Sequence, residues 1–321
     1  MATQTKQRGT NTSNKSAKTT SLQKPQLASR SSLIDKKVVV LTGATSGMGL
    51  RILENLAIDG HTVIAVGRDP AQSREALQSA RAQNSNANIE FCIADLSIMS
   101  QVRILAQDII DKLKKLKINH IDVIYHNAAQ MTKEVEHTYE GHEVQWATNY
   151  LSVVLLTELL HPYLKKSEDA RIIVVTNKPS KKQKLDLRDI QTSKNPRKLY
   201  EYSKLADLMF AMQYNEEFKE ENVRAFAVYP GNVRTEIAQK HLSWFRRWLD
   251  KLSKKNALTI NEGVRTSMYL ITASHLPAKV VLYHNYRPIM PCDYALSPFN
   301  RERLWRATRN KLGLEQTSEI L

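Results

Sequence analysis

Cysteine and long apolar runs are both scarce in this chain of 321 residues. The two cysteines, Cys92 and Cys292, have neither the spacing of a metal site nor the number that a disulfide framework needs. We therefore expect a reducing compartment, no metal ion, and two buried thiols that only fill space. No apolar run reaches the roughly 18 residues of a membrane-spanning helix, and the N-terminus lacks a secretory hydrophobic core. The sequence predicts a protein that is not integral to a membrane.

Acidic residues are absent from positions 1 to 34, although the whole chain has a formal charge of +15. This segment is rich in Ser, Thr, Gln and Asn, so it buries too little apolar area to offset the entropy of ordering. We expect residues 1–35 to form a disordered basic tail. An acid-poor, Ser-rich organelle transit peptide in 1–34 is the alternative, and otherwise a cytoplasmic or membrane-peripheral location is favoured. The basic residues of the segment are Lys6, Arg8, Lys15, Lys18, Lys24 and Arg30.

A nucleic-acid-reading motif is also missing, and aromatic residues do not interleave with the positive charges. The charge therefore indicates attraction to other acidic partners, such as anionic lipid or a phosphorylated cofactor. We expect no nucleic-acid partner.

From Lys36 onward, short β-branched runs alternate with longer helical stretches and no internal repeat is present. This alternation is typical of βαβ units, whose parallel sheet is covered on both faces by crossover helices. We predict one Rossmann-type, doubly wound α/β domain over residues 36–321, with a mostly parallel sheet of about seven strands. Ligands bind at the carboxyl ends of such strands. The expected strands are 38–41, 62–66, 89–93, 121–125, 172–175, 225–228 and 280–283, and the expected helices include 50–58, 140–164 and 200–218.

A glycine-rich turn, Thr42-Gly43-Ala44-Thr45-Ser46-Gly47-Met48-Gly49, joins the first expected strand to a helix. Glycine there permits backbone angles closed to other residues, lets the backbone approach a pyrophosphate, and aims free helix N–H groups at negative charge. The turn resembles the T-G-x-x-x-G-x-G turn of the short-chain dehydrogenase/reductase family, which implies an oxidoreductase with a nicotinamide dinucleotide. The resemblance assigns the cofactor contacts of this turn to Gly43, Ser46, Gly47, Met48 and Gly49.

Arg68 follows the second expected strand, where NAD-specific folds place a carboxylate for the ribose hydroxyls. A guanidinium suits a 2′-phosphate because its planar fork donates paired, charge-assisted hydrogen bonds. In similar family members an arginine here accompanies NADP(H), so we predict that cofactor. Asp69 is the neighbouring residue and leaves the NAD alternative open.

Three further segments resemble the family in the expected order along the chain. Asp95 and Leu96 follow the third strand, at the place of the family's adenine-contacting aspartate. The fourth strand leads into His126-Asn127-Ala128-Ala129, similar to the family's N-N-A-G turn, which implies that Asn127 and Ala128 lie beside the cofactor. His126 departs from that pattern, and we predict a structural role for it. Asn149 matches the helix asparagine that holds a relay water in the family.

The expected chemistry depends on Tyr200 and Lys204, in Tyr200-Glu201-Tyr202-Ser203-Lys204. Residues four apart on a helix face the same way, so both side chains can reach one pocket. A phenol with a pKa near 10 is a poor acid or base at neutral pH, but a nearby ammonium favours the phenolate. The pair matches the family's catalytic tyrosine and lysine, which contact both substrate and cofactor.

A segment after the next strand, Tyr229-Pro230-Gly231-Asn232-Val233-Arg234-Thr235, resembles the family's P-G-x-V-x-T loop beside the nicotinamide. The resemblance assigns cofactor contacts to Pro230, Gly231, Val233 and Thr235, and it places a substrate lid at about 238–258. Ser203-Lys204-Leu205-Ala206, Thr235-Glu236, the insert before Tyr200 and Arg303-Leu304-Trp305 resemble the retinol-dehydrogenase-like group.

One departure concerns the substrate-orienting serine of the family. Asn177 stands at its position, after Thr176. An asparagine amide can donate a hydrogen bond to a carbonyl but cannot relay a proton. Two functions follow: an NADP(H)-dependent oxidoreductase acting on a carbonyl or alcohol of a small lipophilic substrate such as a retinoid, steroid or aldehyde, or a catalytically weak or silent NADP-binding regulatory or scaffold protein.

The segment 241–255 has a basic, amphipathic helical pattern with two tryptophans. Such a helix either packs on its own domain, covers an apolar substrate pocket, or contacts an anionic membrane peripherally. A homodimer is compatible with the sequence.

Overall fold

The computed structural model describes Met1 and residues 35–178, 180, 183–233, 258–277 and 281–314. Within these residues eight strands form one sheet in the order β3-β2-β1-β4-β5-β6-β7-β8. Neighbouring strands run parallel except for the last pair, which is antiparallel. The strands are β1 (Val38–Thr42), β2 (Thr62–Gly67), β3 (Ile89–Ile93), β4 (Val123–His126), β5 (Ala170–Val175), β6 (Val223–Val228), β7 (Leu282–His284) and β8 (Arg287–Pro288).

Helices follow most strands, as βαβ connections require. The helices of the described part are α1 (Gly47–Asp59), α2 (Pro70–Gln83), α3 (Met99–Lys115), α4 (Val144–Trp146), the π-helix η1 (Ala147–Leu151), α5 (Ser152–Leu164), α6 (Asp189–Thr192), α7 (Pro196–Glu217), α10 (Ile260–Gly263), α11 (Arg265–Thr272), α12 (Asp293–Leu296) and α13 (Pro298–Leu312).

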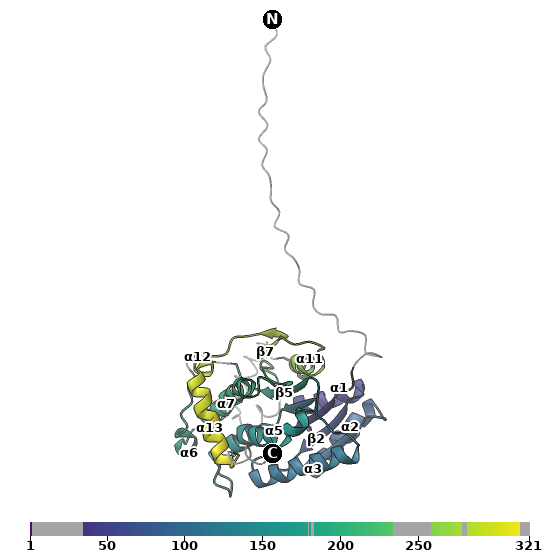
Figure 1. The fold of residues 1–321 in the computed structure, drawn as a ribbon, viewed down its shortest axis with the longest axis horizontal. Helices are drawn as coiled ribbons and strands as arrows, with labels where there is room; N and C mark the ends of the chain where they lie inside the picture. Colours follow the sequence, from purple (N-terminus) through teal and green to yellow (C-terminus); the bar gives the residue numbers. More distant parts are fainter. Residues whose placement is uncertain (2–34, 179, 181–182, 234–257, 278–280, 315–321) are drawn as a thin grey trace, which may run out of the picture. The chain divides into compact units, whose positions relative to one another are not determined.

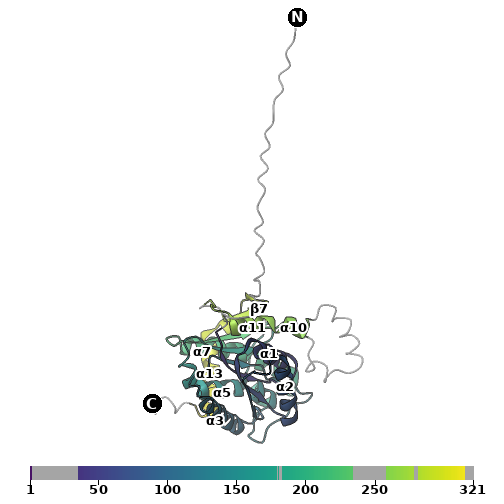
Figure 2. The same cartoon turned by 90° about the vertical axis from the view of Figure 1, so that its right-hand side faces the viewer.

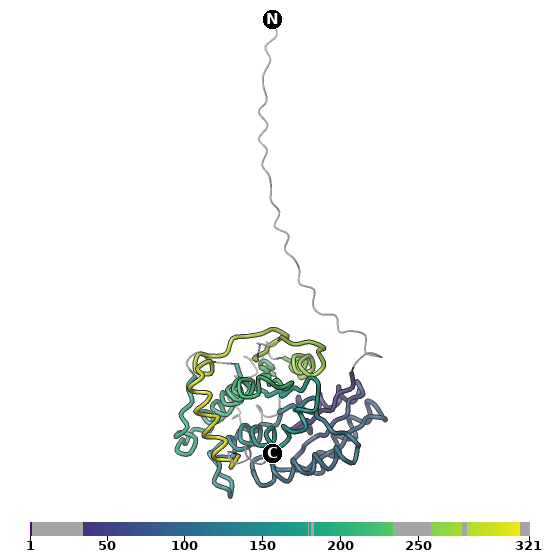
Figure 3. Tube along the Cα trace, in the orientation of Figure 1, coloured from purple at the N-terminus to yellow at the C-terminus, as the bar shows by residue number. Residues whose placement is uncertain are grey.

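The sheet is buried on both faces, which explains why its strands are almost continuously apolar. Along β1, Val38 and Val40 face one core cluster, whereas Val39 and Leu41 face the other. Helices α3, α5, α7 and α13 contribute to the first cluster, and α1, α2 and α11 to the second (Figures 1 and 2). The trace in Figure 3 shows the yellow C-terminal helix α13 returning to pack beside α7.

Polar side chains define where several helices begin. Asp69 accepts hydrogen bonds from the first free N–H groups of α2, and Asn195 and Ser297 do the same for α7 and α13. A proline occupies the first turn of each of these helices, where no backbone N–H is needed. These local signals, visible in the sequence, fix the first turns of the three helices.

The predicted fold class is confirmed, with differences at the edges. The expected strand at 280–283 is shifted to Leu282–His284, and it pairs with β8, a two-residue strand too short to leave an apolar pattern. The helix expected from 140 begins at Val144, because the Glu143 carboxylate caps it and Gly141 adopts a φ of 79° in the preceding turn.

Other expectations fall outside the described residues. The basic tail over 1–35, apart from Met1 and Asp35, and the lid at 238–258, apart from Leu258, lie there, so both stay predictions. No described helix combines the length and apolarity needed to cross a bilayer. Within the same residues, no three His, Cys, Asp or Glu side chains are grouped as metal ligands would be.

Candidate active site

A pocket of about 430 Å³ opens at the carboxyl ends of the strands. It lies over β1, where the strand order reverses between β2 and β4, the place where doubly wound sheets bind ligands. The pocket brings together most of the site residues expected from the sequence. Those lining it are Gly43, Ser46, Gly47, Met48, Arg68, Asp95, Leu96, Asn127, Ala128, Asn177, Tyr200, Lys204, Pro230, Gly231 and Val233.

The glycine turn between β1 and α1 leaves no room for a side chain at two of its positions. A Cβ atom on Gly43 would lie 2.8 Å from the Cα atom of Ala128, and one on Gly49 would lie 1.9 Å from the Gly43 carbonyl oxygen. Gly43 and Gly47 also have positive φ angles, 65° and 55°, which disfavour residues with side chains. Gly49 is buried and does not line the pocket. The absence of a side chain there lets the first turn of α1 pack against the Gly43 carbonyl.

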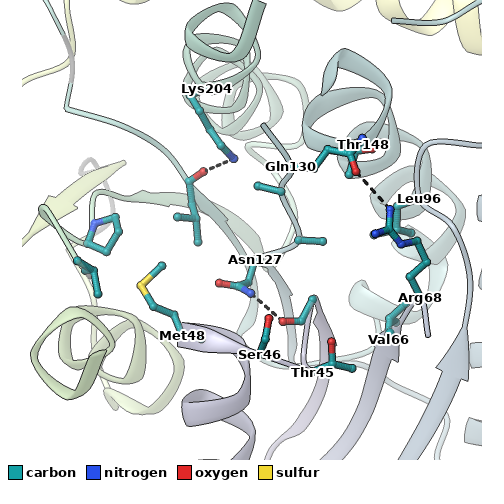
Figure 4. Close-up of a pocket in the computed structure, with 18 of the residues that line it drawn as sticks. Thr45, Ser46, Met48, Val66, Arg68, Leu96, Asn127, Gln130, Thr148 and Lys204 are labelled. Carbon is teal, nitrogen blue, oxygen red and sulfur yellow. Dashed lines mark hydrogen bonds between the residues drawn. The ribbon is translucent and has the colours of Figure 1, made fainter. Parts of the chain in front are cut away.

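Arg68 and Asp69 follow β2 at the pocket wall but point to different partners. The Arg68 guanidinium is exposed and donates to Gln130 Oε1 at 3.3 Å (Figure 4). The Asp69 carboxylate accepts from the backbone N–H groups of Ala71 and Gln72 at 2.7 and 2.9 Å. Asp69 therefore has its charge directed at the N-terminus of α2, whereas the fork of Arg68 is available to a ligand.

The turns after β3 and β4 are held by local hydrogen bonds. Asp95 Oδ1 accepts from the backbone and the hydroxyl of Ser97, at 2.9 and 2.8 Å. Asn127 Nδ2 donates to the Gly43 carbonyl at 3.0 Å, which ties β4 to the glycine turn (Figure 4). The backbone N–H groups of Asn127 and Ala128 share the Thr42 hydroxyl, each at 3.2 Å.

Tyr200 and Lys204 reach the same pocket from α7, as their spacing predicts. Lys204 is 4% exposed, and its ammonium donates to the Val175 carbonyl at 2.9 Å and to Asp207 Oδ2 at 3.0 Å. Figure 4 shows this side chain extended between α7 and the end of β5. An ammonium has three donors, so these two bonds leave one N–H for the pocket.

Asn149 is fully buried in η1 and does not line the pocket. Its amide clamps the loop after β4: Oδ1 accepts from the Gln130 N–H at 2.8 Å, and Nδ2 donates to the Gln130 carbonyl at 3.1 Å and to the Ser203 hydroxyl at 3.0 Å. The side chain thus joins the loop of β4 to α7. Its expected role with a relay water stays a prediction.

Asn177 lines the pocket together with Tyr200, so the position of the family serine is part of the same cavity. Its neighbour Thr176 is buried, and its hydroxyl donates to the Lys204 carbonyl at 2.6 Å. The Thr176 hydroxyl therefore anchors α7. The Asn177 amide is left as the side-chain donor at this position of the pocket lining.

His126, the last residue of β4, is a buried, neutral side chain that does not line the pocket. Nε2 lies 2.9 Å from the Thr157 hydroxyl. Burial, reinforced by the nearby Lys204 charge, lowers the pKa of His126 to about 3. A group that stays neutral throughout the physiological range fits the structural role expected for it.

The sequence did not identify several residues of the pocket lining, among them Thr45, Gln130 and Thr148, nor Asp207, which contacts Lys204. Gln130 and Thr148 come from a loop and a helix with no distinctive motif, so only folding places them here. Asp207 did carry a signal, because a residue three positions after Lys204 lies on the same helix face. Thr235 lies outside the described residues.

Comparison with known proteins decides the family. A sequence model of the family described as short chain dehydrogenase matches residues 37–245. The chain belongs to the short-chain dehydrogenase family. The matched region contains the glycine turn, Tyr200, Lys204 and the loop with Pro230. A member of this family is an oxidoreductase of the dehydrogenase/reductase type, which acts on CH–OH or C=O groups.

The family resemblance extends over most of the chain. Retinol dehydrogenase 12 of Mus musculus is 29% identical over 285 residues, which cover 88% of this chain and 88% of the relative. Polyprenol dehydrogenase of Homo sapiens is 30% identical and covers 75% of this chain and 74% of its own length. The NADPH-bound carbonyl reductase from chicken fatty liver has the same fold, with a TM-score of 0.60 and 20% identity over 80% of this chain and all of that one. The predicted retinol-dehydrogenase-like character of this short-chain dehydrogenase is confirmed.

Proposed function

We propose that this short-chain dehydrogenase is an NADP(H)-dependent oxidoreductase that transfers a hydride between the nicotinamide and a carbonyl or alcohol carbon of a lipophilic substrate. The observation that carries the proposal is one pocket that holds the glycine turn, Arg68, Tyr200 and Lys204 together. One reaction needs three features in the same cavity: a turn that binds the phosphates, a partner for the 2′-phosphate, and an acid/base pair.

The chemistry of the pocket lining suits a dinucleotide. Gly43 and Gly47 give backbone that a pyrophosphate can approach, next to the N–H groups at the start of α1. The Thr148 hydroxyl lies in the lining, and it is buried without a hydrogen-bond partner among the described residues. Buried polar atoms usually have partners, so a ligand that bonds to Thr148 would satisfy it.

The choice of NADP(H) over NAD(H) rests on the contrast between Arg68 and Asp69. The Asp69 carboxylate is engaged with the amides of α2, and so it is not turned toward ribose hydroxyls. The Arg68 guanidinium is held near the pocket by a neutral partner, Gln130, at 3.3 Å. A 2′-phosphate forms stronger, charge-assisted bonds than an amide oxygen and would replace that partner.

The chemistry divides between the cofactor and the chain. A bound nicotinamide supplies or accepts the hydride at the substrate carbon. The Tyr200 hydroxyl gives its proton to the carbonyl oxygen during reduction and takes it back during oxidation. The Lys204 ammonium favours the phenolate left on Tyr200 and keeps one N–H for the ribose. The Asn177 amide donates a hydrogen bond that orients the carbonyl oxygen.

The lipophilic substrate is supported by the relatives. Two of them are named for alcohols, retinol and polyprenol. Met48, Val175 and Val233 add apolar surface to the pocket lining. The silent alternative is not favoured, because Asn177 retains a donor in the pocket and these relatives are dehydrogenases. The amphipathic segment 241–255 lies outside the described residues, and its contact with a substrate or an anionic membrane stays a prediction.

Substitution of Tyr200 by Phe tests the chemistry. The change removes the phenol while keeping the ring, so we expect reduction of retinal and decanal by NADPH to fall at least 100-fold while NADPH binding is kept. The rate of NADPH oxidation, followed at 340 nm for the wild type and the variant, provides the measurement. With the wild type, NADH should bind and react less well than NADPH.

Tyr202→Phe is the matched control, since Tyr202 lies on the same helix but bonds to Asp189 at 2.9 Å, outside the pocket. It should keep wild-type turnover. Unchanged turnover in Tyr200→Phe, or a wild type that binds NADH more tightly than NADPH, would contradict the proposal.

A further inference from the structure

Asp207 is a buried carboxylate directly behind the catalytic pair. It lies on α7 one turn after Lys204, with the side chain 2% exposed, and its Oδ2 atom is 3.0 Å from the Lys204 ammonium. Its other oxygen, Oδ1, is buried and has no hydrogen-bond partner within the described part of the chain. A carboxylate in such surroundings is costly unless a charge compensates it.

The ammonium is held from two sides by these contacts. Val175 at the end of β5 accepts one N–H at 2.9 Å, and Asp207 accepts a second. The side chain of Lys204 is 5% exposed, yet it lines the pocket. Both acceptors therefore restrict the ammonium at the pocket wall, and one of its three donors remains for the pocket.

The titratable groups near the Asp207–Lys204 pair come from three elements. Lys204, on α7, is the one ionised group of the described residues that acts on it. On η1, the Tyr150 hydroxyl bonds to Thr308, and its pKa is raised by burial and further by Asp207, so it remains neutral. On β4, His126 is kept neutral by burial and by Lys204. The carboxylate and the ammonium thus form an isolated pair.

We propose that Asp207 is a positioning residue for Lys204, which fixes the ammonium behind Tyr200 and cancels part of its charge whenever the carboxylate is ionised. This inference rests on the proposed function. Burial, opposed by the attraction of Lys204, raises the pKa of Asp207 to about 7. Above that pH the Lys204 ammonium is compensated by a carboxylate, and below it the ammonium is uncompensated.

The Asp207→Asn variant tests the charge while keeping an oxygen that accepts from Lys204. The NADP⁺-dependent oxidation of decan-1-ol releases a proton to a base in the site, so kcat/KM should rise with pH. Removal of the negative charge leaves the Lys204 ammonium uncompensated, so the midpoint of this rise in kcat/KM should move about one pH unit lower. Circular dichroism at each pH verifies that the variant is folded.

Glu158→Gln is the matched control. Glu158 is also a buried carboxylate with one cationic partner, Arg309 at 2.8 Å, and burial raises its pKa to about 7. It lies on α5 and does not line the pocket, so the midpoint should stay at the wild-type value. A midpoint that is unchanged in Asp207→Asn, or shifted equally in both variants, would overturn the inference.

A titration without turnover keeps the inference separate from the proposed function. In protein labelled with ¹³C at aspartate carboxyls, one signal should titrate near pH 7, vanish in Asp207→Asn, and move to higher pH in Lys204→Met. This result with an inactive wild type would reject the proposed function but retain the pair. If no aspartate titrates above pH 6 in the wild type, the inference fails even where Asp207→Asn does not fold.

Discussion

At the scale of single residues, burial decides the protonation state of His126. His126 stands where the family turn has an asparagine, and it is 4% exposed beside Thr157. Its pKa is lowered to about 3, first by burial and then by Lys204, so the folded protein binds no proton there near neutral pH. The unfolded chain, with an ordinary histidine pKa near 6.5, does bind one below that value.

A stability measurement can isolate this residue. Because the pKa of His126 is depressed on folding, its contribution is present above pH 6.5 and is lost as the pH falls toward 3. The free energy of unfolding of the wild type, relative to His126→Asn, should therefore decrease by about 2 kcal/mol between pH 7.5 and pH 5.0. Urea denaturation at the two values measures it, and a constant difference would argue against a neutral, buried imidazole.

At the scale of elements, a buried arginine fastens a helix to the sheet on the side away from the pocket. Arg171, at the start of β5, is fully buried and donates to the carbonyls of Leu270 and Ala273, at 2.8 and 2.5 Å, at the end of α11. Asp169 balances its charge and also binds Arg224 at 2.8 Å. The pair therefore links β5, β6 and α11 in one network.

The chain offers a matched test of this network, because Asp169 and Arg171 have the same spacing as Asp186 and Arg188. The Arg171 side chain is fully buried, whereas that of Arg188 is 86% exposed. Asp169→Ala should lower the free energy of unfolding by about 3 kcal/mol, since it leaves a buried guanidinium without its counter-charge. Asp186→Ala should have little effect. Equal losses in chemical denaturation of the two variants would refute the distinction.

At the scale of the whole molecule, the pocket is lined by residues that follow each of the strands β1 to β6, so a ligand that binds only the folded sheet stabilises it against unfolding. At a free concentration one hundred times its dissociation constant, a single-site ligand adds about 2.7 kcal/mol. NADPH should raise the melting temperature more than NADH at equal concentration, and Arg68→Gln should remove most of this difference. Arg306→Gln, which alters an exposed pair with Glu302, serves as the control. A preference for NADPH that survives in Arg68→Gln would assign 2′-phosphate recognition elsewhere.

Much of the fold was predictable because local signals agreed with one another. Apolar runs on β1 and β5 mark strands buried on both faces, and Asp69 with Pro70 marks the start of α2. The edge strand β8 was missed because two exposed residues leave no pattern. The start of the helix at Val144 was misplaced because only the contact of Glu143 with its amides defines it.

By itself, the sequence determined the family, the order of strands and helices, and the residues of the glycine turn and of the Tyr200–Lys204 pair. These follow from spacing along the chain, which sets the backbone angles and which side chains share a face. Only the tertiary structure decided that Asn149 clamps the loop at Gln130 and that Asp207 is buried against Lys204. Such choices depend on which group loses water and which partner lies within bonding distance after packing, whereas linear spacing shows only which side chains share a helix face.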